Sequence, residues 1–320
     1  MNKIIIYKNT FIVQKELRKL INILKEKIFE NNGVLFGDIV ANLLIVKYYK
    51  SIFEKNNNNF DYFWNNDFDK ETILRTEVCN KINVYFNNLE EYIKFIDFLK
   101  NSKIFEITVI KNINNSHHIN NLYEISTKLG KTLTYIGYPI NVSVNIIVKI
   151  PGTNSYLEPP FNDTNFLTDI LIMRKNREYK ISKNTGIVEI DEMNIIEKSI
   201  FYSKILKEIC NKKNYILCKK IELNNIIAKR VLEYNKNECD IVNSPLIITK
   251  CSNSFKNKCY ICQYEINYDD DIMLINISKC MLHNECGYKY LEKLLETNEN
   301  INCPLRQSIN FINNNNNLIF

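Results

Sequence analysis

The chain has 320 residues and a mass of 37.9 kDa, and 45% of its residues are hydrophobic and 24% charged. This composition excludes a disordered, collagen-like or coiled-coil protein and leaves room for about two domains with a sizeable core. The 42 basic and 36 acidic residues give a net charge of +6 without a block of like charge. Binding of nucleic acid or a nucleotide is therefore permitted but not indicated.

Residue usage is biased in a way that reflects the genome before it reflects function. Alanine occurs only at Ala41 and Ala228, whereas Asn, Ile and Lys are abundant, as in an AT-rich source such as a large DNA virus. No stretch approaches the roughly 20 apolar residues of a membrane span. We expect no membrane partner and a cytoplasmic location, in the host cytoplasm if the source is viral. There, ten cysteines favour thiols or metal ligands over disulfides.

The first half of the chain alternates between helical and strand-like patterns. Apolar residues at helical spacing predict a helix over residues 12–29, which Asn31, Asn32 and Gly33 end. The elements predicted after this helix are a strand or tight turn at 34–36, a helix at 39–49, a strand at 81–86, a helix at 89–99 and strands at 104–110 and 141–150.

The pattern becomes mainly helical after a predicted hairpin of residues 169–173 and 178–181. Helical periods follow over 195–210 and 221–232. We therefore expect an α+β fold class with four parts, which are an α+β domain at 1–190, a helical extension at 191–250, a small cysteine-rich domain at 251–310 and an Asn-rich tail at 311–320.

Two segments of the first part resemble motifs of the nucleotidyltransferase fold found in poly(A) polymerases and tRNA nucleotidyltransferases. Phe36-Gly37-Asp38-Ile39-Val40-Ala41-Asn42 aligns with the family's Gly-Gly-x-Val-Arg-Asp, and Lys81-Ile82-Asn83-Val84-Tyr85-Phe86 aligns with its Asp-x-Asp strand. Val144-Asn145-Ile146 is the candidate for the third carboxylate position, and residues 165–171 resemble a further family segment. The resemblance implies a mixed sheet with helices and a nucleotide site at Gly37, Asp38, Asn83 and Asn145.

The departures from these motifs matter chemically. Nucleotidyl transfer needs metal ions held by paired carboxylates. Lys81 and Asn83 occupy the two aspartate positions, and a neutral amide binds magnesium too weakly to replace a carboxylate. The resemblance thus implies a catalytically dead copy with a vestigial nucleotide site. A turn at Gly37 followed by a helix cap at Asp38 explains the same residues without any ligand, so both interpretations stay open.

The cysteines gather near the C-terminus, where six of the ten lie between residues 251 and 303. Cys259 and Cys262 form a Cys-x-x-Cys pair, and His283 with Cys286 forms a second pair. Three thiolates and one imidazole at these spacings can reach one tetrahedral ion, and soft sulfur ligands favour zinc. We therefore expect one structural zinc per chain. The alternative is a core histidine beside unrelated thiols.

This segment resembles the RING-type zinc finger of ubiquitin ligases. The family's tail, Cys-x-His-x-x-His-x-x-Cys-Ile-x-x-Trp-Leu followed by Cys-Pro-x-Cys-Arg, aligns with residues 278–291 and 303–306. The resemblance makes one zinc site complete, with the ligands Cys259, Cys262, His283 and Cys286. The second site of the family is degenerate here and is expected to be empty, because its positions hold Ser278, Cys280, Cys303 and Arg306.

A second alignment leaves each site one ligand short. It makes Cys280 and His283 the third and fourth ligands of the family, with Lys289 and Arg306 in ligand positions. Cys251, eight residues before the first pair, could substitute for a missing ligand in either alignment.

The RING resemblance also implies a partner surface. In that family a shallow groove binds the ubiquitin-conjugating enzyme, and Ile261, Tyr290 and Pro304 match its positions. The same residues could instead cap a small zinc-held core. Our first hypothesis is a non-catalytic protein-binding adaptor with a dead nucleotidyltransferase-like scaffold and a single-zinc module. The alternatives are an active ubiquitin ligase with a conjugating enzyme as its partner, and a nucleotidyltransferase with carboxylates that the motifs do not reveal.

Overall fold

The computed structural model groups the chain into two compact units. The first comprises Met1–Thr164 and Thr168–Cys210, and the second comprises Asn165–Leu167 and Asn211–Phe320. The structure describes residues 2–55, 81–112, 119–129, 133–135, 138–140, 142–151, 159, 164–176, 179–183, 185–217, 225–236, 239–244, 246–251, 257–275, 280–297 and 304–305.

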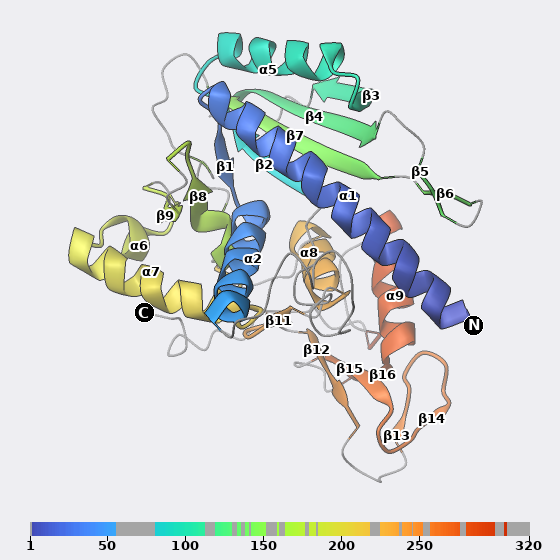
Figure 1. The fold of residues 1–320 in the computed structure, drawn as a ribbon. Helices are drawn as coiled ribbons and strands as arrows, with labels where there is room; N and C mark the ends of the chain where they lie inside the picture. The colour runs from blue at the N-terminus through green and yellow to red at the C-terminus, as the bar shows by residue number, and fades with distance from the viewer. Residues whose placement is uncertain are drawn as a thin grey trace. The chain divides into compact units, whose positions relative to one another are not determined.

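A seven-stranded mixed sheet forms the frame of the first unit (Figure 1). Its strands in spatial order are β3 (Phe105–Asn112), β4 (Ile119–Leu129), β7 (Ser143–Pro151), β2 (Lys81–Tyr85), β1 (Val34–Phe36), β8 (Leu171–Met173) and β9 (Tyr179–Ile181). Strands β2 and β7 run parallel, and the other neighbours run antiparallel. A separate hairpin of β5 (Leu133–Tyr135) and β6 (Tyr138–Ile140) lies between β4 and β7 in the chain.

Helices pack on this sheet through apolar stripes. The helices in the described part of this unit are α1 (Asn2–Glu30), α2 (Asp38–Lys55), α5 (Leu89–Asn101), α6 (Val188–Asp191) and α7 (Ile195–Cys210). Helix α1 packs on β1 and β7, α2 packs on β1, β2 and β8, and α5 packs on β3. Helix α5 begins where the Asn88 side chain accepts a hydrogen bond from the Glu91 backbone N–H, at 2.9 Å. Its Phe95 is fully buried and packs on Phe86, with ring centroids 5.4 Å apart.

The expected mixed sheet with helices is confirmed, and so is the predicted hairpin, which is formed by β8 and β9. One long strand, β4, was not predicted, because its first residues continue an Asn-rich stretch and alternate only from Ile125 onward. The short 3-10 helix Leu167–Ile170 precedes β8. The nucleotidyltransferase likeness and the four-part domain division stay predictions.

In the described part of the second unit there are a three-stranded antiparallel sheet and two helices. Its sheet has the order β12 (Leu246–Lys250), β15 (Asp271–Ile275) and β16 (Cys280–His283). The other elements are the parallel pair β10 (Lys213–Asn214) and β11 (Asp240–Ile241), the hairpin of β13 (Asn257–Lys258) and β14 (Glu265–Ile266), and the helices α8 (Asn225–Lys236) and α9 (Asn284–Thr297). Helix α9 packs on β15, β16 and α8.

The core of this unit is apolar but small. Its fully buried members include Phe166, Ile227, Val231, Met273, Leu282 and Leu291. The guanidinium of Arg230 lies 4.3 Å from the centroid of the Phe166 ring and donates to the Tyr234 hydroxyl at 2.7 Å. Among the described helices, none has both the length and the apolar character that crossing a membrane requires.

Candidate metal centre

The turn between β13 and β14 carries Cys259 and Cys262. The Cys259 N–H donates to the Tyr264 carbonyl, and the Gln263 N–H donates to the Cys259 carbonyl, both at 2.9 Å. Gln263 has a φ of 61°, a left-handed conformation that side-chain-bearing residues adopt at a cost. These bonds reverse the chain within a few residues, so that both cysteine side chains project from one tight loop.

The other two side chains come from the junction of β16 and α9. Along β16, Cys280 and Leu282 are buried while Met281 and His283 are half-buried, as alternation along a strand requires. His283 is the last residue of the strand. Because α9 begins directly after it, Cys286 lies in the first helical turn, close to the imidazole.

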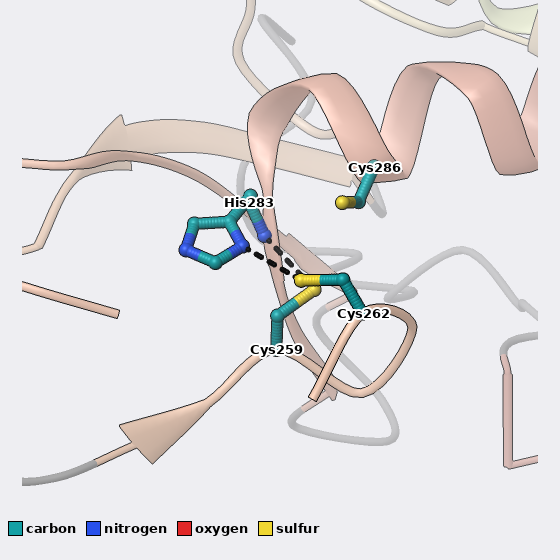
Figure 2. Close-up of side chains that lie close together, drawn as sticks. All are labelled: Cys259, Cys262, His283 and Cys286. Atoms are coloured by element: carbon teal, nitrogen blue, oxygen red, sulfur yellow. Dashed lines mark hydrogen bonds between the residues drawn. The ribbon is translucent and has the colours of Figure 1, made fainter. Parts of the chain in front are cut away.

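These four residues converge in space (Figure 2). One donor atom from each of Cys259, Cys262, His283 and Cys286 lies within 4.8 Å of all the others. The Cys262 Sγ is 3.3 Å from the His283 Nδ1. In a tetrahedral zinc site the ordinary bond lengths separate the ligand atoms by roughly 3.5–3.8 Å. The group therefore fits a metal ion after small side-chain adjustments, and it could hold one.

Contacts around the imidazole determine which nitrogen faces the sulfurs. The His283 Nε2 lies 3.3 Å from the Glu265 carbonyl oxygen and 3.9 Å from an oxygen of the Asp270 carboxylate. Asp270 is itself held by the Asn267 N–H at 2.7 Å. An N–H at Nε2 thus donates away from the cluster and leaves the lone pair of Nδ1 directed toward it. Outer contacts of this kind orient histidine ligands in metal sites.

The thiols respond differently to this environment. Burial acts to raise the pKa of Cys259, but backbone N–H groups of Cys262, Ile261 and His283 stabilise its thiolate and lower the pKa to about 6. Burial raises the pKa of Cys286 to about 12, and the hydrogen bond to Cys262 and the charge of Cys259 act in the same direction. Neighbouring thiolates oppose one another's ionisation, and a divalent cation removes that conflict.

Cys251 and Cys280, the other described cysteines of this region, are not members of the group. Cys280 pairs with Ile275 and so lies at the Leu246 end of the sheet, whereas Cys251 follows Lys250 at the opposite end. A strand rises about 3.3 Å per residue and five residues separate Leu246 from Cys251, so these two cysteines are about 16 Å apart along the strand direction alone and cannot share an ion. Cys303 and the other two positions of the degenerate site, Ser278 and Arg306, lie outside the described residues.

The alternation along β16 also bears on the choice between the two ligand alignments. The alternative alignment makes Cys280 and His283 successive ligands, but they lie on opposite faces of the strand. The four residues that cluster in the structure are those that the first alignment assigns to one site, and Cys280 is not among them.

The residues matched to the RING groove have different environments. Ile261 is exposed in the turn between the two cysteines, with 39% of its surface accessible. Tyr290 packs partly buried against the core of the second unit, and Pro304 is partly buried in a short turn. Sequence reasoning missed the neighbouring tyrosines, of which Tyr264 is 74% and Tyr268 71% exposed. The signal was present as three tyrosines within nine residues of Cys259.

Three of the four residues of the implied nucleotide site are near neighbours. Gly37 has a φ of 76°, and a Cβ added to it would lie 3.1 Å from the Asn83 Nδ2. That added Cβ would lie 3.9 Å from a carboxylate oxygen of the buried Asp169, a residue that the sequence did not single out. Asp38 accepts a hydrogen bond from the Thr168 hydroxyl at 2.6 Å.

The fourth residue, Asn145, is exposed on β7. Asn145 pairs with Lys81 of the neighbouring strand β2. Asn83 lies two residues after Lys81 on β2, so the side chains of Asn83 and Asn145 are on the same face of the sheet. This cluster thus gathers polar groups around Gly37, with two carboxylates in it.

Comparison with known proteins adds little to this description. No protein-family model and no curated protein matches the chain. Among solved structures, the crystal structure of smu.1046c from Streptococcus mutans UA159 is similar over 44% of this chain and 67% of its own, with 9% identity and a TM-score of 0.23. A likeness of this size supports no statement about fold or function.

Proposed function

We propose that the second unit contains a zinc-held protein-binding module and that the chain is a non-catalytic adaptor. The observation that carries this proposal is the convergence of three thiols and one imidazole beneath a turn that exposes large side chains. Soft sulfur donors with one imidazole are the set that zinc prefers among common ions.

The donor set supports a structural role for the ion. Catalytic zinc sites keep one position open for water or substrate, whereas four protein ligands close a tetrahedral site. Closure also links the turn to the start of α9, two segments of a small core. Binding a structural zinc contributes about 10 kcal/mol or more to the folding of such modules.

The proposed binding surface is the knuckle surface, which we define as the side chains of Tyr260, Ile261, Tyr264 and Tyr268. All four are exposed and lie within nine residues of one another. Tyrosines supply large contact areas with little loss of side-chain freedom and are enriched in protein interfaces. Exposed Glu265 and Asp269 lie in the same stretch, so a partner with basic groups suits this surface.

Quantitative affinity purification of three metal-loaded proteins tests the adaptor function. These are the natural chain, the double variant Tyr264→Ala/Tyr268→Ala and the control Tyr48→Ala, which removes an exposed tyrosine from α2. The proposal expects a protein that binds the natural chain and the control but not the double variant, and that does so again when both are purified. Equal recovery with all three chains contradicts it.

A ubiquitin ligase is a second candidate, favoured by the exposed Ile261 in the turn between two ligands. A ligase would act by restraining a conjugating enzyme in a reactive geometry. The test is discharge of ubiquitin from a panel of charged conjugating enzymes, with the expectation that Ile261→Ala abolishes it. Absence of discharge across the panel excludes this candidate.

A nucleotidyltransferase is a third candidate, favoured by the position of Asp38 and Asp169 beside Gly37. Two carboxylates are the minimum that a metal-dependent transfer requires. Incorporation of labelled nucleotide in the presence of magnesium, lost in Asp169→Asn, would support it. No incorporation by the natural chain excludes it.

A further inference from the structure

Helix α7 exposes three isoleucines in its first two turns, which is more exposed large apolar side chains than any other helix shows among the described residues. Ile195 is 88%, Ile196 71% and Ile200 57% exposed. The opposite stripe of the helix is buried, with Phe201, Ile205 and Ile209 at intervals of four residues. Residues advance by roughly 100° around a helix, so Ile196 and Ile200 project almost directly away from that buried stripe.

The first turn of the helix, which carries Ile196, is held by a side-chain cap. Asn194 caps it by accepting hydrogen bonds from the backbone N–H groups of Ile196 at 2.9 Å and Glu197 at 3.0 Å. In return the Asn194 N–H donates to the Glu197 carboxylate at 2.8 Å. This reciprocal capping box holds the first turn in place. Ile196 and Ile200 are therefore held one turn apart on one face and form a continuous apolar strip.

Small residues accompany the strip. Ser199 and Ser203 lie on the same side of the helix, and the Ser203 hydroxyl donates back to the Ser199 carbonyl at 3.0 Å. That bond satisfies the Ser203 hydroxyl within the helix. The two small serine side chains therefore leave the helix backbone accessible beside the isoleucines. A second helix can approach such a surface closely.

Charge is distributed unequally along this face. Exposed Glu192 lies just ahead of the helix and Glu197 in its first turn, whereas exposed Lys204 and Lys207 lie in its second half. The face is therefore acidic at one end and basic at the other. Two copies arranged antiparallel bring unlike charges together, and two copies arranged parallel bring like charges together.

We propose that the outer face of α7 is a self-association surface, on which α7 of a second copy of this chain packs antiparallel about a two-fold axis. An axis midway between Ile196 and Ile200 places each Ile196 against the partner's Ile200. The same arrangement directs Glu192 toward the partner's Lys204. In such an isologous contact the same surface of both copies buries the apolar strip and pairs each acidic end with a basic end, as in closed dimers. The proposal is independent of the zinc module.

Sedimentation equilibrium of the full metal-loaded chain over a wide concentration range tests this proposal. We expect a monomer–dimer equilibrium, and Ile200→Glu should raise the dissociation constant at least about tenfold, as loss of an interface anchor does. The matched control is Ile93→Glu, which changes an exposed isoleucine of α5 and should leave the dimer intact. Circular dichroism checks that the variants fold, and Ile200→Ser replaces Ile200→Glu if the latter does not.

A charge exchange identifies the direction of the pairing. Lys204→Glu should weaken the dimer, and the double change Glu192→Lys/Lys204→Glu in the same chain should restore it. A dimer that becomes tighter in Lys204→Glu contradicts the antiparallel arrangement. A natural chain that stays monomeric, or a dimer that neither Ile200→Glu nor Lys204→Glu weakens, overturns the proposal.

Discussion

The two units stabilise their cores by different means. The first unit buries a seven-stranded sheet under long helices, with fully buried aromatic and aliphatic side chains such as Phe86, Phe95 and Leu24. Among the described residues the second unit has a three-stranded sheet and fewer buried side chains, and four potential metal ligands connect its β13–β14 turn to the start of α9. This comparison leads us to propose that apolar burial suffices for the first unit, whereas the second unit relies on an ion in addition.

Removing the metal should have the largest effect and should be confined to one unit. We expect a strong chelator to destabilise the second unit by about 10 kcal/mol, the scale of structural zinc binding, and to leave the first unit folded. Hydrogen exchange read by mass spectrometry provides the measurement. Peptides from β15 and α9 should lose protection while those from β2 and β7 keep theirs. Protection that is unchanged in α9 would show that the module needs no ion.

A core truncation in the first unit should show the opposite pattern. Phe95 is fully buried against Phe86, so Phe95→Ala should cost about 3–5 kcal/mol through the lost burial and the cavity. Denaturant unfolding followed by exchange in β2 measures this loss, and the metal content should stay unchanged. A variant that also releases metal would contradict the separation of the two cores.

Two glycines offer a smaller and matched comparison. A Cβ added to Gly287 would lie 2.6 Å from the Sδ of the fully buried Met273, and one added to Gly33 would lie 2.9 Å from the Ile28 carbonyl oxygen. Each alanine substitution should destabilise its own unit by about 1–3 kcal/mol, the usual cost of overpacking. Amide hydrogen exchange should become faster in α9 for Gly287→Ala and in β1 for Gly33→Ala. If either variant has unchanged stability, the neighbouring side chains move enough to accommodate the added methyl group.

Local patterns explain which parts of this structure the sequence could predict. The alternation of β7 and the helical period of α5 are strong because their buried faces are nearly continuous. The four candidate metal ligands were predictable because they form two short pairs, each with its members three residues apart in the sequence. Alternation also predicts which residues of β16 face the core, but only after residues 280–283 have been recognised as a strand.

Other features depend on contacts between distant segments. Asp169 reaches Gly37 because β1 pairs with β8, which lies more than a hundred residues later in the chain. No local pattern encodes that pairing. The exposure of Tyr264 and of the α7 isoleucines was likewise hidden, because a sequence shows that a side chain is apolar but not whether another segment covers it.

The central claim is that Cys259, Cys262, His283 and Cys286 hold one structural zinc. Elemental analysis of the purified chain beside two matched variants tests it most directly. Cys286→Ser removes a member of the group, whereas Cys280→Ser removes a buried cysteine outside it. We predict one zinc per chain in the natural protein and in Cys280→Ser, and its loss in Cys286→Ser. A natural protein without zinc, or zinc that persists in Cys286→Ser and is lost in Cys280→Ser, would contradict the claim.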